Sequence, residues 1–274
     1  MSAVTPRPTA SSLQDQVIVV TGGSKGIGLA TAAELVARGA RVALLARDQA
    51  RLDEALASLP QGRAIAVRAD VSRRGDIDAA LSQVAAAYGR IDGIINNAGF
   101  QFARRIELMP EDEVRRIVDL NFLSVLFCCQ SAIPHLRRAG GGRIVNVSSA
   151  TVRNDNEFSH LAVYSASKAA VEQLSRELRH ELKPDGIMVT VFSPGAVATG
   201  SIANFDPAAA AEAMQDWLTK GAQWDGVTQP EVIGRAIASC FELPPGVAVE
   251  FMEVRPNMPM PKMLESDLGR QAAA

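Results

Sequence analysis

The sequence predicts a single α/β domain built on a doubly wound parallel sheet. Three observations predict it: continuous apolar runs rich in β-branched residues, amphipathic segments that alternate with these runs, and a glycine-rich turn directly after the first run, 17–20. Such runs are typical of strands buried on both faces, and their alternation with helices favours parallel strands joined by right-handed crossovers. With 274 residues, 47% of them apolar, the chain can fill one large core.

The composition excludes several classes of protein. Lys and Arg number 28 against 30 Asp and Glu, and this balance argues against a general nucleic-acid binder. No uninterrupted apolar run approaches the roughly 20 residues of a membrane span. The cysteines have neither a disulfide framework nor metal-ligand spacing, so we expect no metal site and a reducing, cytoplasmic location. These cysteines are Cys128, Cys129 and Cys240.

The first strand, 17–20, runs straight into a glycine-rich turn, and a helix pattern follows over 27–37. In this context the turn predicts a phosphate-binding loop. Gly22 allows the tight turn, Gly26 lets the backbone approach a pyrophosphate, and Gly28 lets the helix pack closely. The helix N-terminus adds free N–H groups and a partial positive charge. The residues expected to bind a dinucleotide cofactor here are Gly22, Ser24, Lys25, Gly26, Ile27 and Gly28.

The end of the second strand, 41–46, bears on which dinucleotide is bound. An acid at this point would bind an adenosine ribose and repel a 2′-phosphate. This chain has no acid there; Arg47 follows the strand, and Lys25 adds a second cation. The sequence therefore favours NADP(H) over NAD(H). The alternative is that Arg47 merely pairs with an acid of the next helix, such as Asp48 or Glu54.

The middle of the chain continues the alternation, with a helix over 51–58, a strand over 64–67 that ends at Asp70 and Val71, and a helix over 76–88. The fourth strand, 91–95, ends in Asn96-Asn97-Ala98-Gly99. Amides and small residues at the carboxyl edge of a parallel sheet suit a site that admits a planar cofactor, although a structural turn would explain the same residues.

A long helix is expected over 111–136, and Asn121 lies in the middle of its apolar stripe. A buried amide needs hydrogen-bond partners. Asn121 is therefore either a structural bridge or part of a polar relay, and the helix pattern alone favours the bridge.

The fifth strand, 143–147, delivers Ser148 and Ser149 to its carboxyl end, where open α/β sheets bind ligands. The next helix begins with Tyr164 and Lys168, four residues apart and so on one face. An ammonium beside a phenol is expected to lower the tyrosine pKa from about 10. Such a phenol can exchange a proton with an alcohol or ketone near neutral pH. Alternatively, the pair is one surface tyrosine and one surface lysine.

The remaining elements follow the same pattern. We expect a strand over 187–192, one or two inserted helices over about 200–226, a helix over 230–241 and a strand over 247–254. Residues 1–12 are interpreted as a disordered lead-in to the domain, 13–254, and 255–274 as a C-terminal tail.

In this order, the motifs together resemble the common single-domain type of the short-chain dehydrogenase/reductase family, which has the Rossmann fold. The resemblance covers roughly 13–254. The motifs that carry it are Thr21-Gly-x-x-x-Gly-x-Gly28, Asp70, Asn96-Asn-Ala-Gly99, Asn121, Ser149, Tyr164-x-x-x-Lys168 and Pro194-Gly-x-Val-x-Thr199.

The resemblance implies a role for each matching residue. Tyr164 would be the acid/base, and Lys168 would lower the tyrosine pKa and bind the nicotinamide ribose. Ser149, in preference to Ser148, would orient the substrate carbonyl. Asn121 would hold a water that links Lys168 to solvent. Further cofactor contacts would come from Asp70 and Val71 at the adenine, from Asn97, Ala98 and Gly99, and from Pro194, Gly195, Val197 and Thr199 around the nicotinamide.

This chain also departs from the family. No glycine follows the serine pair closely, and the segment up to Tyr164 is slightly longer than usual. Arg153, Phe158 and His160 would either read the substrate or close this loop.

The leading hypothesis is an NADP(H)-dependent oxidoreductase that interconverts a ketone or aldehyde and an alcohol. One alternative is a 3-oxoacyl-thioester reductase acting on a carrier-bound substrate, and a remote one is a non-enzymatic nucleotide-binding sensor. Basic residues that would suit an acidic carrier are Arg104, Arg105, Arg137 and Arg138. Aromatic and apolar residues that hint at an apolar or aromatic small-molecule substrate are Phe100, Phe102, Phe158, Met214, Trp217 and Trp224, each of which would equally serve in the core.

The resemblance also implies a homotetramer or homodimer built from the helices that carry Asn121 and Tyr164. Alanines along the second helix would allow close packing between copies, or equally within one copy. They are Ala162, Ala166, Ala169 and Ala170.

Overall fold

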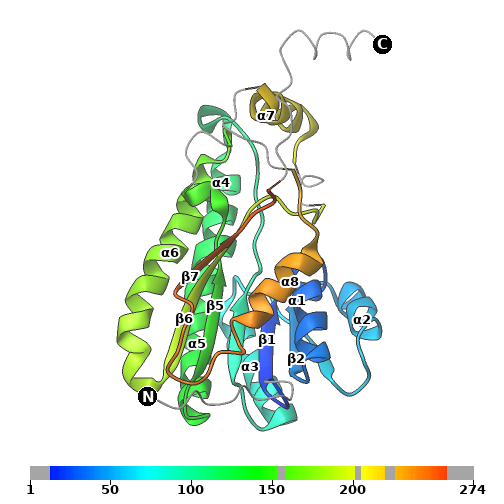
Figure 1. Ribbon diagram of the computed structural model, residues 1–274. Coiled ribbons are helices and arrows are strands. Elements are labelled where there is room, and N and C mark those ends of the chain that lie inside the picture. The colour runs from blue at the N-terminus through cyan, green and yellow to red at the C-terminus, as the bar shows by residue number, and fades with distance from the viewer. Residues whose placement is uncertain (1–12, 154–157, 201–204, 220–225, 258–274) are drawn as a thin grey trace.

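The computed structural model is a parallel sheet with helices on both faces (Figure 1). It describes residues 13–153, 158–200, 205–219 and 226–257. The lead-in expected over 1–12 and most of the C-terminal tail, from 258 onward, lie outside the described residues.

The sheet has seven strands in the order β3-β2-β1-β4-β5-β6-β7, and every pairing is parallel. The order reverses beside β1, because the chain leaves the edge strand β3 and returns to form β4. This is the topological switch point at which open α/β sheets bind ligands. The strands are β1 (Val17–Thr21), β2 (Arg41–Ala46), β3 (Ala64–Arg68), β4 (Gly93–Asn96), β5 (Gly142–Val147), β6 (Ile187–Pro194) and β7 (Phe251–Val254).

Two apolar clusters cover the two faces of the sheet, because successive strand residues point to opposite sides. Val17 and Val19 of β1 belong to one cluster, whereas Ile18 and Val20 belong to the other. Helices α3 (Arg74–Tyr88), α5 (Ser124–Arg138) and α6 (Ala162–Leu182) pack on the first face. Helices α1 (Gly26–Ala37), α2 (Gln49–Ala57) and α8 (Pro230–Ser239) pack on the second.

The inserted segment expected over 200–226 contains helix α7 (Pro207–Thr219), which lies above the sheet in Figure 1, beyond the helices that cover the two faces. It forms a small third cluster in which Trp217 and Phe205 pack with Leu161, the residue just before α6. Because Tyr164 packs against this cluster, α7 covers the start of the helix that carries the predicted acid/base.

The single helix predicted over 111–136 is interrupted. It consists of α4 (Glu111–Val118), a π-helical turn over Asp119–Leu123, and α5. The whole run, Glu111–Arg138, is long and apolar enough to cross a membrane by length and composition alone. In the fold its apolar side faces the sheet, and Val125, Ala132 and Leu136 are almost completely enclosed. A core helix passes the same test of length and composition.

The last strand is shorter than predicted, since β7 begins at Phe251 and not at residue 247. The preceding segment is held instead by Arg143, a buried residue of β5. Its guanidinium donates hydrogen bonds to the carbonyls of Leu243, Pro244 and Val247. The first of the apolar residues that suggested a strand, Val247, therefore belongs to a connection held by a side chain, and backbone bonding to β6 starts only at the Glu250 carbonyl, which accepts from the Val191 N–H at 3.0 Å.

Candidate active site

The glycine-rich turn after β1 has the geometry that its sequence predicts. Gly22 and Gly26 have positive φ values of 64° and 53°, a backbone conformation that favours glycine. A Cβ on Gly28 would stand 2.2 Å from the carbonyl oxygen of Gly22, so only glycine lets α1 begin this close to the turn. Lys25 is the exposed N-cap residue of α1.

The turn is tied to the segment that follows β4. The Thr21 hydroxyl accepts hydrogen bonds from the backbone N–H groups of Asn97 and Ala98, each at 3.0 Å. The Asn97 amide donates in return to the carbonyl oxygen of Thr21 at 3.0 Å. The two loops on either side of the crevice at the switch point are therefore bonded directly to each other.

Tyr164, Lys168 and Ser149 face the same crevice, a cavity of about 420 Å³ at the carboxyl edge of the sheet. Lys168 is buried, with only 4% of its surface exposed. Its Nζ donates to the carbonyl oxygen of Val147 at 2.8 Å and lies 6.0 Å from the centroid of the Tyr164 ring. The surface alternative for this pair is therefore wrong.

The expected fall in the Tyr164 pKa is also wrong for this structure. Burial raises the pKa of Tyr164, and the Ser149 hydroxyl lowers it by a smaller amount. Burial lowers the pKa of Lys168 to about 8. The prediction failed because it counted the charge of the ammonium and not the loss of water around both groups, which disfavours the charged form of each.

Asn121 lies within the π-helical turn and is fully buried. Its side-chain oxygen accepts from the backbone N–H of Phe100 at 3.0 Å. Its amide donates to the Phe100 carbonyl at 2.9 Å and to the Ser167 hydroxyl at 3.2 Å. The side chain is thus a structural bridge between the segment after β4 and helix α6, which is the alternative that the helix pattern favoured.

Most of the predicted cofactor residues line this one cavity. They are Gly22, Ser24, Lys25, Gly26, Ile27, Asn97, Ala98, Gly99, Tyr164, Lys168, Pro194, Gly195, Val197 and Thr199. At Gly99 the backbone passes close to side chains of the π-helical turn and of α6: a Cβ there would stand 2.9 Å from Asn121 Oδ1 and 3.4 Å from Lys168 Nζ. Backbone with few side chains over it, between the N-terminus of α1 at one end and the Tyr164–Lys168 pair at the other, fits an extended dinucleotide.

Gly28, Asn121, Arg47, Asp70 and Val71 do not line this cavity. Val71 is buried in the core beneath the sheet edge. Arg47 and Asp70 line a second cavity of about 540 Å³ together with Arg68 and Arg73.

Charges around the second cavity act on Asp70. Burial raises the pKa of Asp70, but hydrogen bonds from Ser72 and the charges of Arg47 and Arg73 outweigh burial, so the net shift is downward. Asp48, the acid suggested as a partner for Arg47, pairs with Arg51 at 3.4 Å. The exposed Arg47 therefore contributes positive charge at the end of β2.

Several residues near the crevice were not singled out for it by the sequence. Gln101, Thr151, Leu161 and Val227 also line the cavity. Glu172, a buried acid on α6, accepts from Ser148 Oγ at 2.8 Å. An acid at i+4 from Lys168 was the available signal for it, but the same spacing is common on solvated helix faces.

The residues that would either read the substrate or close the loop contact other parts of the protein. Arg153 pairs with Glu172 at 2.9 Å, so it closes the loop. Phe158 stacks edge-on against Trp217, whose indole N–H donates to the Ser159 carbonyl at 2.9 Å. His160, at a positive φ of 64°, lies 3.8 Å from Asp216 and also from Glu212 of α7. Trp224 lies outside the described residues.

Comparison with known proteins identifies the family. The family model described as short chain dehydrogenase matches residues 16–209. An uncharacterized oxidoreductase of Methylorubrum extorquens is 42% identical over 196 residues, covering 69% of this chain and 76% of the relative. An uncharacterized oxidoreductase of Staphylococcus aureus is 32% identical over 195 residues, covering 71% of this chain and 84% of the relative.

Two solved structures are similar along almost their whole length. An alcohol dehydrogenase from the archaeon Thermococcus sibiricus, complexed with 5-hydroxy-NADP, superimposes with a TM-score of 0.76 at 26% identity, covering 91% of this chain and 100% of that one. A dehydrogenase/reductase from Sinorhizobium meliloti gives a TM-score of 0.77 at 28% identity, covering 91% and 97%. With a crevice of this geometry at the switch point of a matching sheet, the chain is an oxidoreductase that belongs to the short-chain dehydrogenase/reductase family.

Proposed function

We propose that the protein is an NADP(H)-dependent oxidoreductase that interconverts a ketone or aldehyde and an alcohol, with Tyr164 as the acid/base. The observation that carries the proposal is that Tyr164, Lys168 and Ser149 line the same cavity as the glycine-rich turn. When bound there, the nicotinamide would supply or accept the hydride.

The protonation states in the crevice suit carbonyl reduction. Because burial raises the Tyr164 pKa, the phenol is neutral at pH 7 and carries the proton that a developing alkoxide needs. Lys168, with a pKa of about 8, is mostly charged at pH 7 and favours negative charge on an oxygen beside it. Ser149 offers a hydroxyl that can hydrogen-bond the same oxygen, and Asn121 holds α6 against the segment after β4.

The preference for NADP(H) is supported by the charges at the adenosine end. Arg47 follows β2 where a ribose-binding acid would stand, and Arg68 and Arg73 line the same second cavity. The solved alcohol dehydrogenase from Thermococcus sibiricus is complexed with an NADP derivative. A 2′-phosphate would find positive charge at this point, whereas a free ribose would find no acid from β2.

A small apolar or aromatic substrate is supported by the wall beyond Tyr164, which Phe158, Leu161 and Trp217 line. The arginines that would suit an acidic carrier are already partnered. Arg104 pairs with Glu113, Arg105 with Glu107, Arg137 with Asp185, and Arg138 contacts His135. We therefore favour a free ketone or alcohol over a carrier-bound thioester. The three buried thiols support a cytoplasmic location.

The experiment is a screen of free ketones and alcohols with NADPH and NADP⁺, in which the absorbance of the reduced nicotinamide reports turnover.

Tyr164→Phe is expected to lower kcat by a factor of about 10³ and to leave NADPH binding nearly unchanged, because it removes one proton donor and little surface. Tyr88→Phe is the matched control: it alters the other tyrosine, whose hydroxyl has no hydrogen-bond partner among the described residues. Full turnover by the Tyr164 variant would refute the proposal.

A second experiment addresses the cofactor. Arg47→Ala is expected to raise KM for NADPH by roughly ten- to a hundredfold, because a charge-assisted contact is lost, and to leave KM for NADH nearly unchanged. Arg51→Ala, a neighbouring exposed arginine that pairs with Asp48, serves as the control. Equal effects of Arg47→Ala on both cofactors would contradict the NADP(H) preference.

A further inference from the structure

A buried acid close to the crevice has no part in the chemistry proposed above. Glu172 lies on α6, four residues after Lys168 and eight after Tyr164, so the three side chains follow one another along one face of the helix. Only 6% of its side-chain surface is exposed. A carboxylate is costly to bury unless it is paired and hydrogen-bonded, so its partners define what it does.

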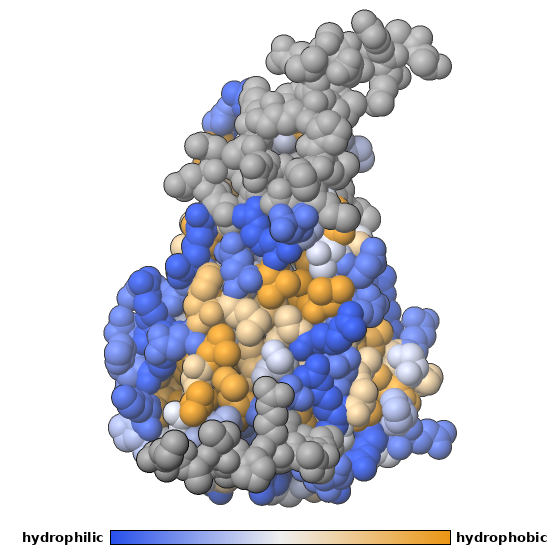
Figure 2. Space-filling model, viewed as in Figure 1, coloured by the Kyte–Doolittle hydropathy of each residue, from blue (hydrophilic) through white to orange (hydrophobic). Residues whose placement is uncertain are grey.

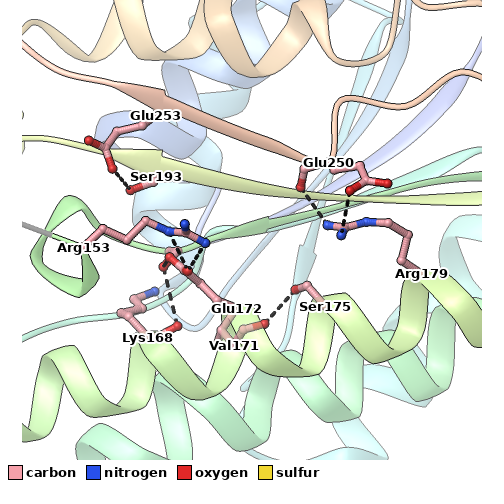
Figure 3. A network of polar contacts seen from close by, with 10 residues as sticks. Arg153, Lys168, Val171, Glu172, Ser175, Arg179, Ser193, Glu250 and Glu253 are labelled. Atoms are coloured by element: carbon pink, nitrogen blue, oxygen red, sulfur yellow. Dashed lines mark hydrogen bonds and ion pairs between the residues drawn. The ribbon is translucent and has the colours of Figure 1, made fainter.

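Glu172 uses both of its carboxylate oxygens. Oε1 accepts a hydrogen bond from the Ser148 hydroxyl at 2.8 Å. Oε2 accepts from Nε of Arg153 at 3.0 Å and from its Nη2 at 2.9 Å (Figure 3). The two partners come from the same loop, on either side of the 3₁₀ turn Ala150–Val152.

Ser149 lies between these two partners. On its N-terminal side, Val147 is held by Lys168 and Ser148 by Glu172, both from α6. On its C-terminal side, Arg153 returns to Glu172 and also places its guanidinium 4.0 Å from the centre of the Phe251 ring in β7. The loop that presents the Ser149 hydroxyl is therefore fastened at both ends to the helix that carries Tyr164.

We propose that Glu172 is a positioning residue that fixes the Ser149 hydroxyl relative to Tyr164 by holding Ser148 and Arg153 together. This inference rests on the proposed function of Ser149. The geometry demands such a support, because displacement of a catalytic group by about 1 Å can cost on the order of a hundredfold in rate. Hydrogen bonds from two loop residues to one buried carboxylate restrict the loop more than those from either residue alone.

The test uses the full chain with NADPH and the best ketone from the screen. Glu172→Gln removes the negative charge and leaves one side-chain oxygen, which would accept from Arg153, while the new amide NH2 would donate to the Ser148 hydroxyl. Both contacts are thereby weakened, because neither is any longer made to a carboxylate. This variant is expected to lower kcat about tenfold and to leave KM for NADPH within about twofold. Glu172→Ala, which removes both contacts, is expected to lower kcat by on the order of a hundredfold.

The matched control is Asp78→Asn. Asp78 also accepts from a serine, Ser131, and from an arginine, Arg74, but this triad joins α3 to α5 away from the crevice. Its kcat is expected to equal that of the unaltered protein. Hydrogen exchange of residues 148–153 gives a readout that does not depend on turnover: it should accelerate in both Glu172 variants and not in Asp78→Asn. Unchanged exchange in the Glu172 variants would overturn the proposal.

Combination with Ser149→Ala separates positioning from a general loss of structure. If Glu172 acts through Ser149, Glu172→Gln lowers kcat in the unaltered protein but causes no further loss once Ser149 is alanine. Equal factors in both backgrounds would overturn the positioning role and leave the proposed function intact. If Ser149→Ala alone keeps full turnover, the role of Ser149 in the proposed function fails first, and the positioning role fails with it.

Should Glu172→Ala not fold, Arg153→Ala, which leaves the Ser148 bond in place, must give the same pattern: a lower kcat in the unaltered protein and no further loss once Ser149 is alanine.

Discussion

Burial of the Lys168 side chain in the crevice lowers the free energy of unfolding. Its ammonium is enclosed and has the Val147 carbonyl as a partner, and burial lowers its pKa from 10.5 to about 8. Between these two values the unfolded chain binds more protons than the folded protein. The free energy of unfolding therefore rises with pH through this window, and the full cost of burying the charge is present below pH 8.

Lys168→Met is accordingly expected to stabilise the protein while it abolishes turnover. The pKa shift corresponds to roughly 3 kcal/mol, and loss of the bond to Val147 costs about 1 kcal/mol, so the net gain at pH 7 is about 2 kcal/mol. Urea unfolding without cofactor measures it. The gain should shrink toward pH 10, and a variant less stable than the parent at pH 7 would contradict the argument.

At this scale the sequence predicted which groups meet but not their electrostatics. Tyr164, Lys168 and Ser149 were predictable because spacing along a helix and position at a strand end determine which side chains share a crevice. The direction of the Tyr164 pKa was not, because burial depends on α7 and on the Phe158–Trp217 contact that closes the rim. Glu172 was missed because its two partners lie in a loop, and a helix pattern says nothing about loop contacts.

At the level of elements, the turn between β1 and α1 depends on the absence of a side chain at one position. Gly28→Ala would force its Cβ against the Gly22 carbonyl oxygen and the Asn97 amide, at 2.2 and 2.7 Å. Neither atom can move away cheaply, since the first is backbone and the second holds the segment after β4.

We expect Gly28→Ala to lower the free energy of unfolding by about 1–3 kcal/mol and to weaken NADPH binding at least tenfold, because the turn and α1 must separate. Gly75→Ala is the control for stability: it also lies in the first turn of a helix, α3, and its Cβ would meet nothing within 4 Å. That variant should be as stable as the parent, or up to about 1 kcal/mol more stable. Unchanged NADPH affinity in Gly28→Ala would show that the close approach is dispensable.

The elements that the sequence misjudged share a physical cause. The π-helical turn at Asp119–Leu123 and the short β7 both involve a polar side chain that bonds to the backbone of a distant segment. Asn121 bonds to the backbone of Phe100, and Arg143 bonds to the carbonyls after α8. Apolar periodicity reports burial and not such bonds. It therefore predicted the order of the elements correctly. It did not predict where a helix is interrupted or where a strand begins.

For the molecule as a whole, we propose that the protein assembles into a homodimer or homotetramer. Two features of its surface support self-association. The alanines Ala162, Ala166 and Ala169 on α6 are exposed among the described residues, whereas Ala170 is half-buried. Figure 2 shows an apolar area near the edge strand β7, bordered by hydrophilic residues. Exposed apolar areas of this kind are typical of interfaces between proteins.

Light scattering at working concentration should therefore give a multiple of 29.1 kDa. Ala169→Arg should shift the mass toward that of a single chain, because an arginine prevents close helix packing while arginine itself forms helices well. Ala50→Arg, an exposed alanine of α2, should leave the mass unchanged. A single-chain mass for the unaltered protein would refute self-association.

The contact between Arg153 and Phe251 affects the stage of protein synthesis at which the loop around Ser149 gains its support. Ser149 and Arg153 leave the ribosome well before Phe251, and a domain generally folds as a unit. Phe251 follows only with β7, and it packs on the arginine that brackets Ser149. The loop that presents Ser149 therefore lacks this contact until β7 has been translated and has joined the sheet.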